Sequence, residues 1–410
     1  MVVMSRAARH RSQYEKKTGR TVRSERDFMG RTYLDHAATT PIRPEVVEMM
    51  VSVMSENYGN PSSVHREGQR AKKLLEEARE RIASLLHCSA QEIYFTSGGT
   101  ESDNWALKCA ALRDFGDADT PTRSGIITSS IEHPAILRSC ESLGKHGIKI
   151  TYLPVDEYGQ VSSDSLVEAL APETSLVSIM LANNEIGTIE PIHVLCKIAH
   201  ENGALFHTDA VQAVGTIPVD ISELGVDLLS FSAHKFGGPK GVGGLYAREG
   251  VKLPSFLNGG AQESHHRAGT ENLPGIVGMA RALELAAEDL EENRKRIRLL
   301  SEKLIALLKE HLPGVRINGH PENRLPGIVS ATFPGQEGER LLLMLDLAGF
   351  ACSSGAACSS KDAKASHVLT AIGLSPEESA CTLRISIGKE NTEDEIIRLA
   401  DAIQKIVGVK

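Results

Sequence analysis

Hydrophobic and polar positions repeat along this chain with two different periods. Between Gln69 and Leu86, apolar residues recur at helical spacing among Lys, Glu and Arg, which predicts an amphipathic helix. From there to about residue 250, short apolar runs alternate with helical stretches. Such runs are typical of strands buried on both faces, so the pattern predicts a mostly parallel sheet covered by helices. The seven predicted strands are 92–96, 126–130, 149–153, 176–181, 204–208, 227–231 and 243–247.

The pattern changes after Gly260. Pro274 suits the first turn of a helix, and helical spacing then continues to about Leu312. The spacing predicts one long helix, and a helix of that length usually connects two domains. Further strand-like runs follow at 315–318, 327–333 and 383–387.

These elements predict an α/β fold with a large domain on a seven-stranded, mainly parallel sheet and a smaller α+β domain. We expect 43–286 to form the large domain and 32–42 with 287–410 to form the small one. The last helix should open at Thr392, because Thr392-x-x-Glu395 is a capping box.

Composition narrows the class of protein. The 410 residues are 41% apolar and 24% charged, and no apolar run approaches the roughly 18 residues of a membrane span. Residues 1–31 carry a net charge of +6 and the remainder −14, so an acidic body argues against nucleic-acid binding. The basic segment has no apolar core and is not a secretory signal. We expect a disordered extension there, with an organelle transit segment as the alternative.

The seven cysteines are odd in number, and no CxxC pair indicates a zinc or dithiol site. A large enzyme without a secretory signal indicates a reducing compartment with free thiols, so we expect the protein in the cytoplasm.

Four short motifs carry candidate chemistry. Residues 95–102 (FTSGGTES) follow a predicted strand and precede a helix, where two glycines would let backbone N–H groups approach a phosphate and the side chains of Thr100 and Ser102 could donate to it. The alternative is an ordinary capped turn. Asp209, at the end of another strand, could keep a pyridinium nitrogen protonated, as pyridoxal phosphate (PLP) requires, or could simply cap the next helix.

The third motif, 231–235 (FSAHK), places Lys235 at a strand end, beside Ser232 and His234, as a Schiff-base candidate. Lys240, between Pro and Gly, indicates a surface turn instead. The fourth motif, 352–360 (CSSGAACSS), is too small and polar for a core and predicts a loop that exposes Cys358. Cys352 lies nearer an apolar run, which favours packing.

With these motifs in order, the chain resembles the cysteine desulfurases of the NifS/IscS class, within the class V aminotransferase-like, fold-type I PLP enzymes. The resemblance runs from residue 33 to about 390. The matching stretches are 33–41 (YLDHAATTP), 95–104 (FTSGGTESDN), 132–133 (EH), 183–187 (NNEIG), 207–212 (HTDAVQ), 230–235 (SFSAHK), 267–270 (RAGT) and 353–358 (SSGAAC).

The resemblance implies a role for each matching residue. Lys235 would bind PLP covalently, Asp209 would pair with the ring nitrogen, Gln212 with the phenolic oxygen, and His133 would stack on the ring. The phosphate would be held by Gly99, Thr100, Ser232 and His234, with Thr270 supplied by the second subunit of a homodimer. Asn184, Arg384 and Asn60 would contact the substrate carboxylate, and Cys358 would take the sulfur.

The activity implied is PLP-dependent removal of sulfur from L-cysteine, giving alanine and a persulfide on Cys358 that passes to an acceptor protein. Such acceptors serve iron–sulfur assembly or thiolation. Alternatives are a selenocysteine lyase, an ordinary class V aminotransferase, and a binding protein that kept the fold without activity. Two features depart from the family pattern: residues 1–31 have no counterpart, and the longer carboxyl tail of the housekeeping members is not expected after Lys410.

Overall fold

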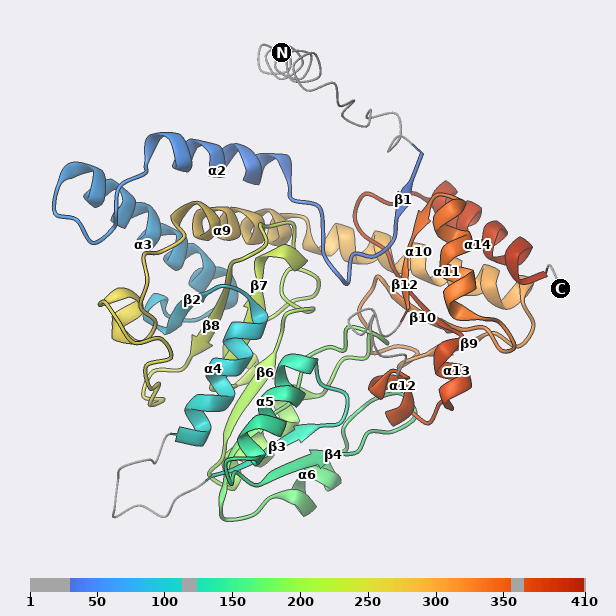
Figure 1. The fold of residues 1–410 in the computed structure, drawn as a ribbon, viewed down its shortest axis with the longest axis horizontal. Coiled ribbons are helices and arrows are strands. Elements are labelled where there is room, and N and C mark those ends of the chain that lie inside the picture. Colours follow the sequence, from blue (N-terminus) through green and yellow to red (C-terminus); the bar gives the residue numbers. More distant parts are fainter. Residues whose placement is uncertain (1–29, 113–123, 355–364, 409–410) are drawn as a thin grey trace, which may run out of the picture.

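The computed structural model describes residues 30–112, 124–354 and 365–408 (Figure 1). All seven predicted strands form, with ends within three residues of the prediction, and they make one sheet in the order β2-β8-β7-β6-β5-β3-β4. Within this sheet β8 runs antiparallel to both neighbours, and the other strands share one direction. The predicted mainly parallel sheet is therefore confirmed. The strands are β2 (Ile93–Thr96), β3 (Gly125–Ser129), β4 (Ile150–Leu153), β5 (Thr174–Ser178), β6 (Leu205–Asp209), β7 (Leu228–Ser232) and β8 (Gly243–Ala247).

Both faces of the sheet are buried, because neighbouring strand residues enter different cores. Val177 and Leu229 join a large apolar cluster beneath α3 (Arg66–Leu86), α7 (Ile192–Glu201) and α9 (Leu273–Glu288). Leu176 and Leu228 join a second cluster beneath α4 (Gly99–Leu112) and α5 (Pro134–Gly144). The period of two along each strand thus produces the helix-covered sheet. The remaining helices of this part are α2 (Pro44–Glu56), α6 (Ser163–Ala169) and α8 (Ile221–Leu224).

The predicted single helix after Pro274 is wrong, because the chain forms two helices, α9 and α10 (Leu290–His311). Asp289 separates them with φ −94° and ψ 0°, and Arg43 donates hydrogen bonds of 3.1 Å to the Leu285 carbonyl and 3.0 Å to Asp289 Oδ2. The arginine thus adds a second donor to the Leu285 carbonyl, which also accepts from Asp289 N at 3.3 Å. The break lets α9 pack on the first core while α10 packs on another.

A second, antiparallel sheet has the order β12-β13-β10-β9 and packs under α10 and α14 (Glu393–Gly408), to the right in Figure 1. Near it, β1 (Thr32–Tyr33) pairs in parallel with β11 (Phe350–Ala351). The predicted capping box is confirmed, because Thr392 N donates to Glu395 at 2.9 Å and Glu395 N donates to Thr392 Oγ1 at 3.4 Å. The other elements are β9 (Arg316–Asn318), β10 (Ile328–Thr332), α11 (Gly338–Leu347), β12 (Ser353–Ser354), α12 (His367–Ala371), α13 (Pro376–Ala380) and β13 (Thr382–Ser386).

The two sheets have separate apolar cores, and the chain passes between them near residue 35 and near Asp289. The domain boundaries expected at 42–43 and 286–287 stay predictions. In the described part of the chain, no helix combines the length and the apolar character needed to cross a bilayer.

Candidate active site

A cavity of about 880 Å³ lies at the carboxyl ends of the large sheet's parallel strands. In open α/β sheets this edge is where ligands bind, because successive strand ends and helix N-termini meet there. The cavity also reaches the second sheet through β12 and β13, so it lies between the two cores. Ten predicted site residues line it: Gly99, Thr100, His133, Asn184, Asp209, Gln212, Ser232, His234, Lys235 and Arg384.

One end of the cavity has the features of an anion site. The turn after β2 places Gly98 at φ +150°, a conformation that favours glycine, and α4 begins at the next residue. The first N–H groups of a helix have no acceptor within the helix and carry partial positive charge. Ser102 anchors this turn by donating to the Gly244 carbonyl at 3.0 Å. A hollow lined by residues 97–101, Ser232 and His234 faces these N–H groups and suits a phosphate.

Asp209 stands at the end of β6 and is 6% exposed. Its Oδ1 accepts a 2.9 Å hydrogen bond from Val211 N. Burial raises the pKa of Asp209, while nearby His133 and Lys235 act in the opposite direction. A cationic ring nitrogen at this carboxylate would offset the cost of its burial.

His207 lies two residues before Asp209 on β6 and is wholly buried. Its ring nitrogens pair with Ser178 Oγ at 2.8 Å and Ser230 Oγ at 3.0 Å, and Asp103 Oδ1 lies 3.8 Å away. Burial lowers the pKa of His207 to about 3, so the ring is neutral. His207 and its two serine partners are therefore uncharged, and they place no positive charge beside Asp209 that would compete with a ligand.

Lys235 ends a short 3-10 turn (Ala233–Lys235) that directly follows β7. Its amine donates to the carbonyl oxygens of Ala37 at 2.5 Å and Ala38 at 3.0 Å. Burial, followed by the neighbouring Lys235, lowers the pKa of His234 to about 4. Lys240 is exposed in a turn, which confirms its interpretation as a surface lysine.

His133 is the N-cap of α5, and its Nδ1 accepts from Ala135 N at 3.1 Å. An Nδ1 that accepts must be unprotonated, so the capping bond fixes the tautomer with the proton on Nε2. Burial lowers the pKa of His133, which keeps the ring neutral at the cavity wall.

Arg384, on β13, brings a guanidinium to the wall of the cavity. Its side chain is 4% exposed and forms an ion pair of 2.8 Å with Asp35 Oδ1, and Nη1 donates to the Asn184 carbonyl at 3.2 Å. Arg384 Nε is buried and has no hydrogen-bond partner among the residues that the structure describes. A guanidinium with spare donors suits the carboxylate of a small substrate.

Two predicted site residues that the structure describes, Thr270 and Asn60, do not line this cavity. Cys358 lies outside the described residues. Thr270 is exposed and does not line the cavity, and its predicted reach into a second subunit stays a prediction. Asn60 is also exposed and accepts from Ser62 N at 2.9 Å. Cys352 packs against the second core, and burial raises its pKa to about 12, as a packing role requires.

Other polar residues at the cavity were not predicted. The motif stretches quoted above contain three of them, Asp35, Asp103 and Glu185, so the sequence could have indicated these as site residues. Ser366 and His367 carry no such signal. Ser366 Oγ donates to Glu185 at 2.6 Å, and His367 Nε2 lies 2.9 Å from the Glu132 carbonyl, so these contacts exist only through the fold.

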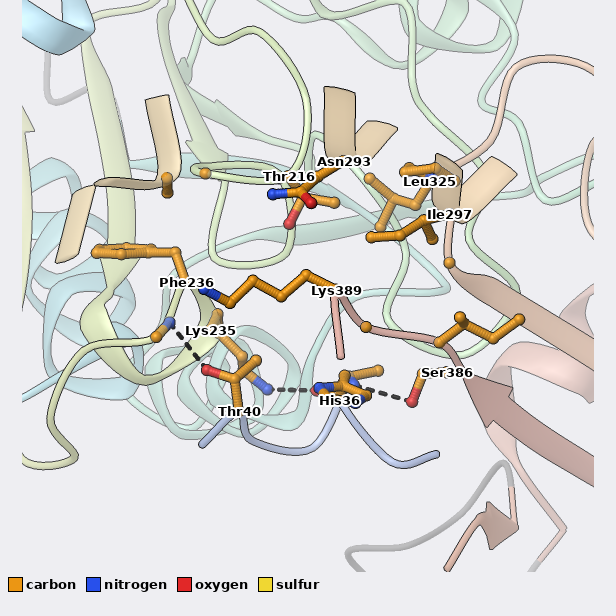
Figure 2. A pocket seen from close by; sticks show the side chains of 18 of the residues that line it. His36, Thr40, Thr216, Lys235, Phe236, Asn293, Ile297, Leu325, Ser386 and Lys389 are labelled. Atoms are coloured by element: carbon orange, nitrogen blue, oxygen red, sulfur yellow. Dashed lines mark hydrogen bonds between the residues drawn. The ribbon is translucent and has the colours of Figure 1, made fainter. Parts of the chain in front are cut away.

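A second, smaller cavity of about 130 Å³ lies beyond Ala37, Gln212 and Lys235, which also line the first. Figure 2 shows this cavity with His36 and Thr40 on one side, Thr216 and Asn293 on another, and Lys389 extended across it.

The residues of the larger cavity fit PLP. An anion cradle, a buried carboxylate and a lysine amine line a single cavity, and these are the groups that phosphate, pyridinium and aldehyde require. The mainly parallel sheet with this set at its carboxyl edge defines a fold-type I PLP-dependent enzyme.

The family model "Aminotransferase class-V" matches residues 32–399, so the chain belongs to the class-V aminotransferase family, whose members depend on PLP. It is 50% identical over 378 residues to the cysteine desulfurase IscS of Methanosarcina thermophila, covering 92% of this chain and 91% of that one. It is 44% identical to the putative cysteine desulfurase IscS 1 of Bacillus subtilis, covering 92% and 99%.

Solved structures agree. A NifS-like protein superposes with a TM-score of 0.86 at 40% identity, covering 93% of this chain and 100% of that one. A structure described as SspA in complex with cysteine has a TM-score of 0.77 at 35% identity, covering 88% and 99%. The fold and family expected from the motifs are confirmed.

Proposed function

We propose that this protein is a PLP-dependent cysteine desulfurase that converts L-cysteine to L-alanine and carries the sulfur as a persulfide on Cys358. The observation that carries the proposal is the single cavity that joins Lys235, Asp209 and Arg384. Relatives named cysteine desulfurase align with 92% of this chain, and one structural neighbour was solved with cysteine.

The chain's own residues account for substrate binding. The positive charge of Arg384 attracts the α-carboxylate, while the carbonyl of Asn184 holds one guanidinium nitrogen in place. Asp35 and Glu185 also line this cavity, and their carboxyl groups disfavour a second negative charge on the ligand, so a substrate with one carboxylate and a small neutral side chain fits best.

The same residues account for proton movement. When bound, PLP supplies an electron sink for the α-carbon. The amine of Lys235 would take the α-proton of the substrate and later give it back as the general acid. Asp209 keeps its negative charge beside the ring nitrogen. His133 could take the proton of the attacking thiol only at Nδ1, and it would release Ala135 N to do so, because Nε2 already carries a proton.

Sulfur transfer is a displacement at the substrate's sulfur. The Cys358 thiolate forms the S–S bond, the substrate's C–S bond breaks, and its electron pair stays on the β-carbon. That carbon takes a proton and becomes the methyl group of alanine. The persulfide then passes to a thiol of an acceptor protein. We further propose a cytoplasmic homodimer, because free thiols need a reducing compartment and Thr270 is placed outside its own cavity.

The test is the Cys358→Ala variant, purified as the holoenzyme and assayed for alanine, sulfide and protein-bound persulfide. We expect the absorbance of bound PLP to remain and alanine formation to fall to background. Cys352→Ala is the matched control, since that thiol packs against the second core and should leave turnover unchanged. Alanine and sulfide formation by Cys358→Ala at the parent rate would show that Cys358 does not take the sulfur.

A further inference from the structure

Residues 35–40 form a strap that separates the two cavities. Asp35 and Ala38 line the larger cavity, whereas His36 and Thr40 line the smaller one, and Ala37 borders both. Figure 2 shows the strap passing beneath Lys235, with His36 and Thr40 pointing into the smaller cavity.

One end of the strap is tied to the small sheet. Ala37 N donates to Ser386 Oγ at 2.9 Å, and Ser386 N donates to the Leu34 carbonyl at 2.7 Å. Ser386 and Arg384 lie on the same strand, β13, and have adjacent positions on one side of it. These two hydrogen bonds therefore connect the strap directly to the strand that carries the guanidinium.

The other end is tied to the turn that carries Lys235. Thr40 N donates to the His234 carbonyl at 2.9 Å, and Gly237 N donates to Thr40 Oγ1 at 2.9 Å. Between the two ends, the carbonyls of Ala37 and Ala38 accept from the Lys235 amine, and Ala37 also accepts from Gln212 Nε2 at 2.9 Å. The strap thus spans the distance between the reactive amine and the carboxylate-binding arginine.

Asp35 makes the strap's one charged contact with the arginine. A guanidinium that is 4% exposed needs a counter-charge, and Asp35 Oδ1 supplies it at 2.8 Å. Glu185 is a competing anion, since the charge of Arg384 lowers the pKa of Glu185 against the effect of burial. Without Asp35, the Arg384 guanidinium would lose the ion pair that fixes the orientation of its Nη2.

We propose that Asp35 is a positioning residue for recognition of the substrate's α-carboxylate: through the strap, it sets the Arg384 guanidinium at a fixed place relative to the Lys235 amine. This inference rests on the proposed function. Asp35 accepts from Nη2 and the Asn184 carbonyl accepts from Nη1, so each terminal nitrogen keeps a second N–H for the incoming carboxylate. A carboxylate held there presents the α-carbon to the lysine in one orientation.

The experiment compares two ligands that differ only in the carboxylate, L-alanine and ethylamine. Each is titrated into holoenzyme, and binding is followed by the change in PLP absorbance. In Asp35→Ala we expect L-alanine affinity to fall about 10-fold, the size of one charge-assisted hydrogen bond, with ethylamine affinity unchanged. Asp35→Asn keeps an acceptor oxygen for the guanidinium and should restore part of the loss. In the Arg384→Ala background, Asp35→Ala should add nothing further.

Asp289→Asn is the matched control. Asp289 also pairs with a buried arginine at the junction of the two cores, Arg43 at 3.0 Å, but it does not line the larger cavity. Its replacement should leave both ligand affinities unchanged. Equal weakening of both ligands by Asp35→Ala, unchanged L-alanine affinity, or an undiminished effect without Arg384 overturns the inference. If the parent enzyme releases no alanine from cysteine, the proposed function fails instead, and the binding comparison still stands.

Discussion

The backbone N–H of Val211 donates a 2.9 Å hydrogen bond to Oδ1 of Asp209 and so holds this carboxylate at the cavity wall. The donor Val211 lies in the turn that follows β6, and Asp209 is the last residue of that strand. The carboxylate is thereby pre-oriented before any ligand enters.

Replacing Asp209 by Asn should therefore keep the fold and the covalent lysine link but slow turnover. An amide cannot hold a proton on the ring nitrogen by its charge, so we expect a decrease in kcat of about 100- to 1,000-fold. The measurement is steady-state alanine formation by protein with a full content of PLP. Asp227→Asn is the control, because Asp227 is also a buried sheet aspartate but bonds Phe206 N and His200 away from the cavity. Equal activity of Asp209→Asn and the parent would contradict the role.

Glu132 should make stability depend on pH. It is wholly buried, accepts from Ser129 Oγ at 2.6 Å and Met180 N at 2.9 Å, and burial raises its pKa to about 8 from the ordinary 4.5. Between those two values the folded protein binds more protons than the unfolded chain, so stability falls as pH rises.

In Glu132→Gln this contribution disappears, because the amide does not titrate. As pH rises from 5 to 8, the free energy of unfolding should fall less steeply in Glu132→Gln than in the parent, by up to about 1.4 kcal/mol per pH unit. Urea denaturation of both proteins at each pH gives the two slopes. Glu185 and Glu190, with pKa values raised to about 7 and about 8 by burial, remain in both proteins and cancel in the difference. A parent-minus-variant difference that is constant across this range would refute the assignment.

The Arg79–Glu263 pair should be the costliest ion pair to break. Glu263 is 3% exposed at its side chain, receives both guanidinium nitrogens at 2.6 and 2.9 Å, and accepts from Phe95 N at 2.9 Å. It also begins a run of three left-handed residues, Glu263, Ser264 and His265, with φ of 45°, 55° and 66°. The ion pair holds a turn that the backbone alone disfavours.

Glu263→Ala removes the carboxylate partner of the partly buried Arg79, which keeps the Ile93 carbonyl as a hydrogen-bond acceptor, so we expect a loss of about 3 kcal/mol in the free energy of unfolding. Glu141→Ala, which breaks the exposed Arg138–Glu141 pair, is the control and should have little effect. Chemical denaturation of both variants at one pH makes the comparison, and similar losses in the two would be the contrary result.

Local pattern was enough for much of the fold. The helix at α3, all seven strands of the large sheet and the capping box at Thr392 follow from periods of two and 3.6 residues and from side chains three positions apart. Strand-end positions likewise singled out Lys235 and Asp209, and the resemblance to a known family added His133, which lines the same cavity.

The tertiary structure alone decided the rest. Arg43 contacts the break at Asp289 from 246 residues away, and helical periodicity does not indicate this contact. The contact of Asp35 with Arg384 joins residues 349 positions apart, and that of Ser366 with Glu185 joins residues 181 apart. Periodicity and capping act within a few residues, whereas these partners meet only after two sheets have packed and brought their edges around one cavity.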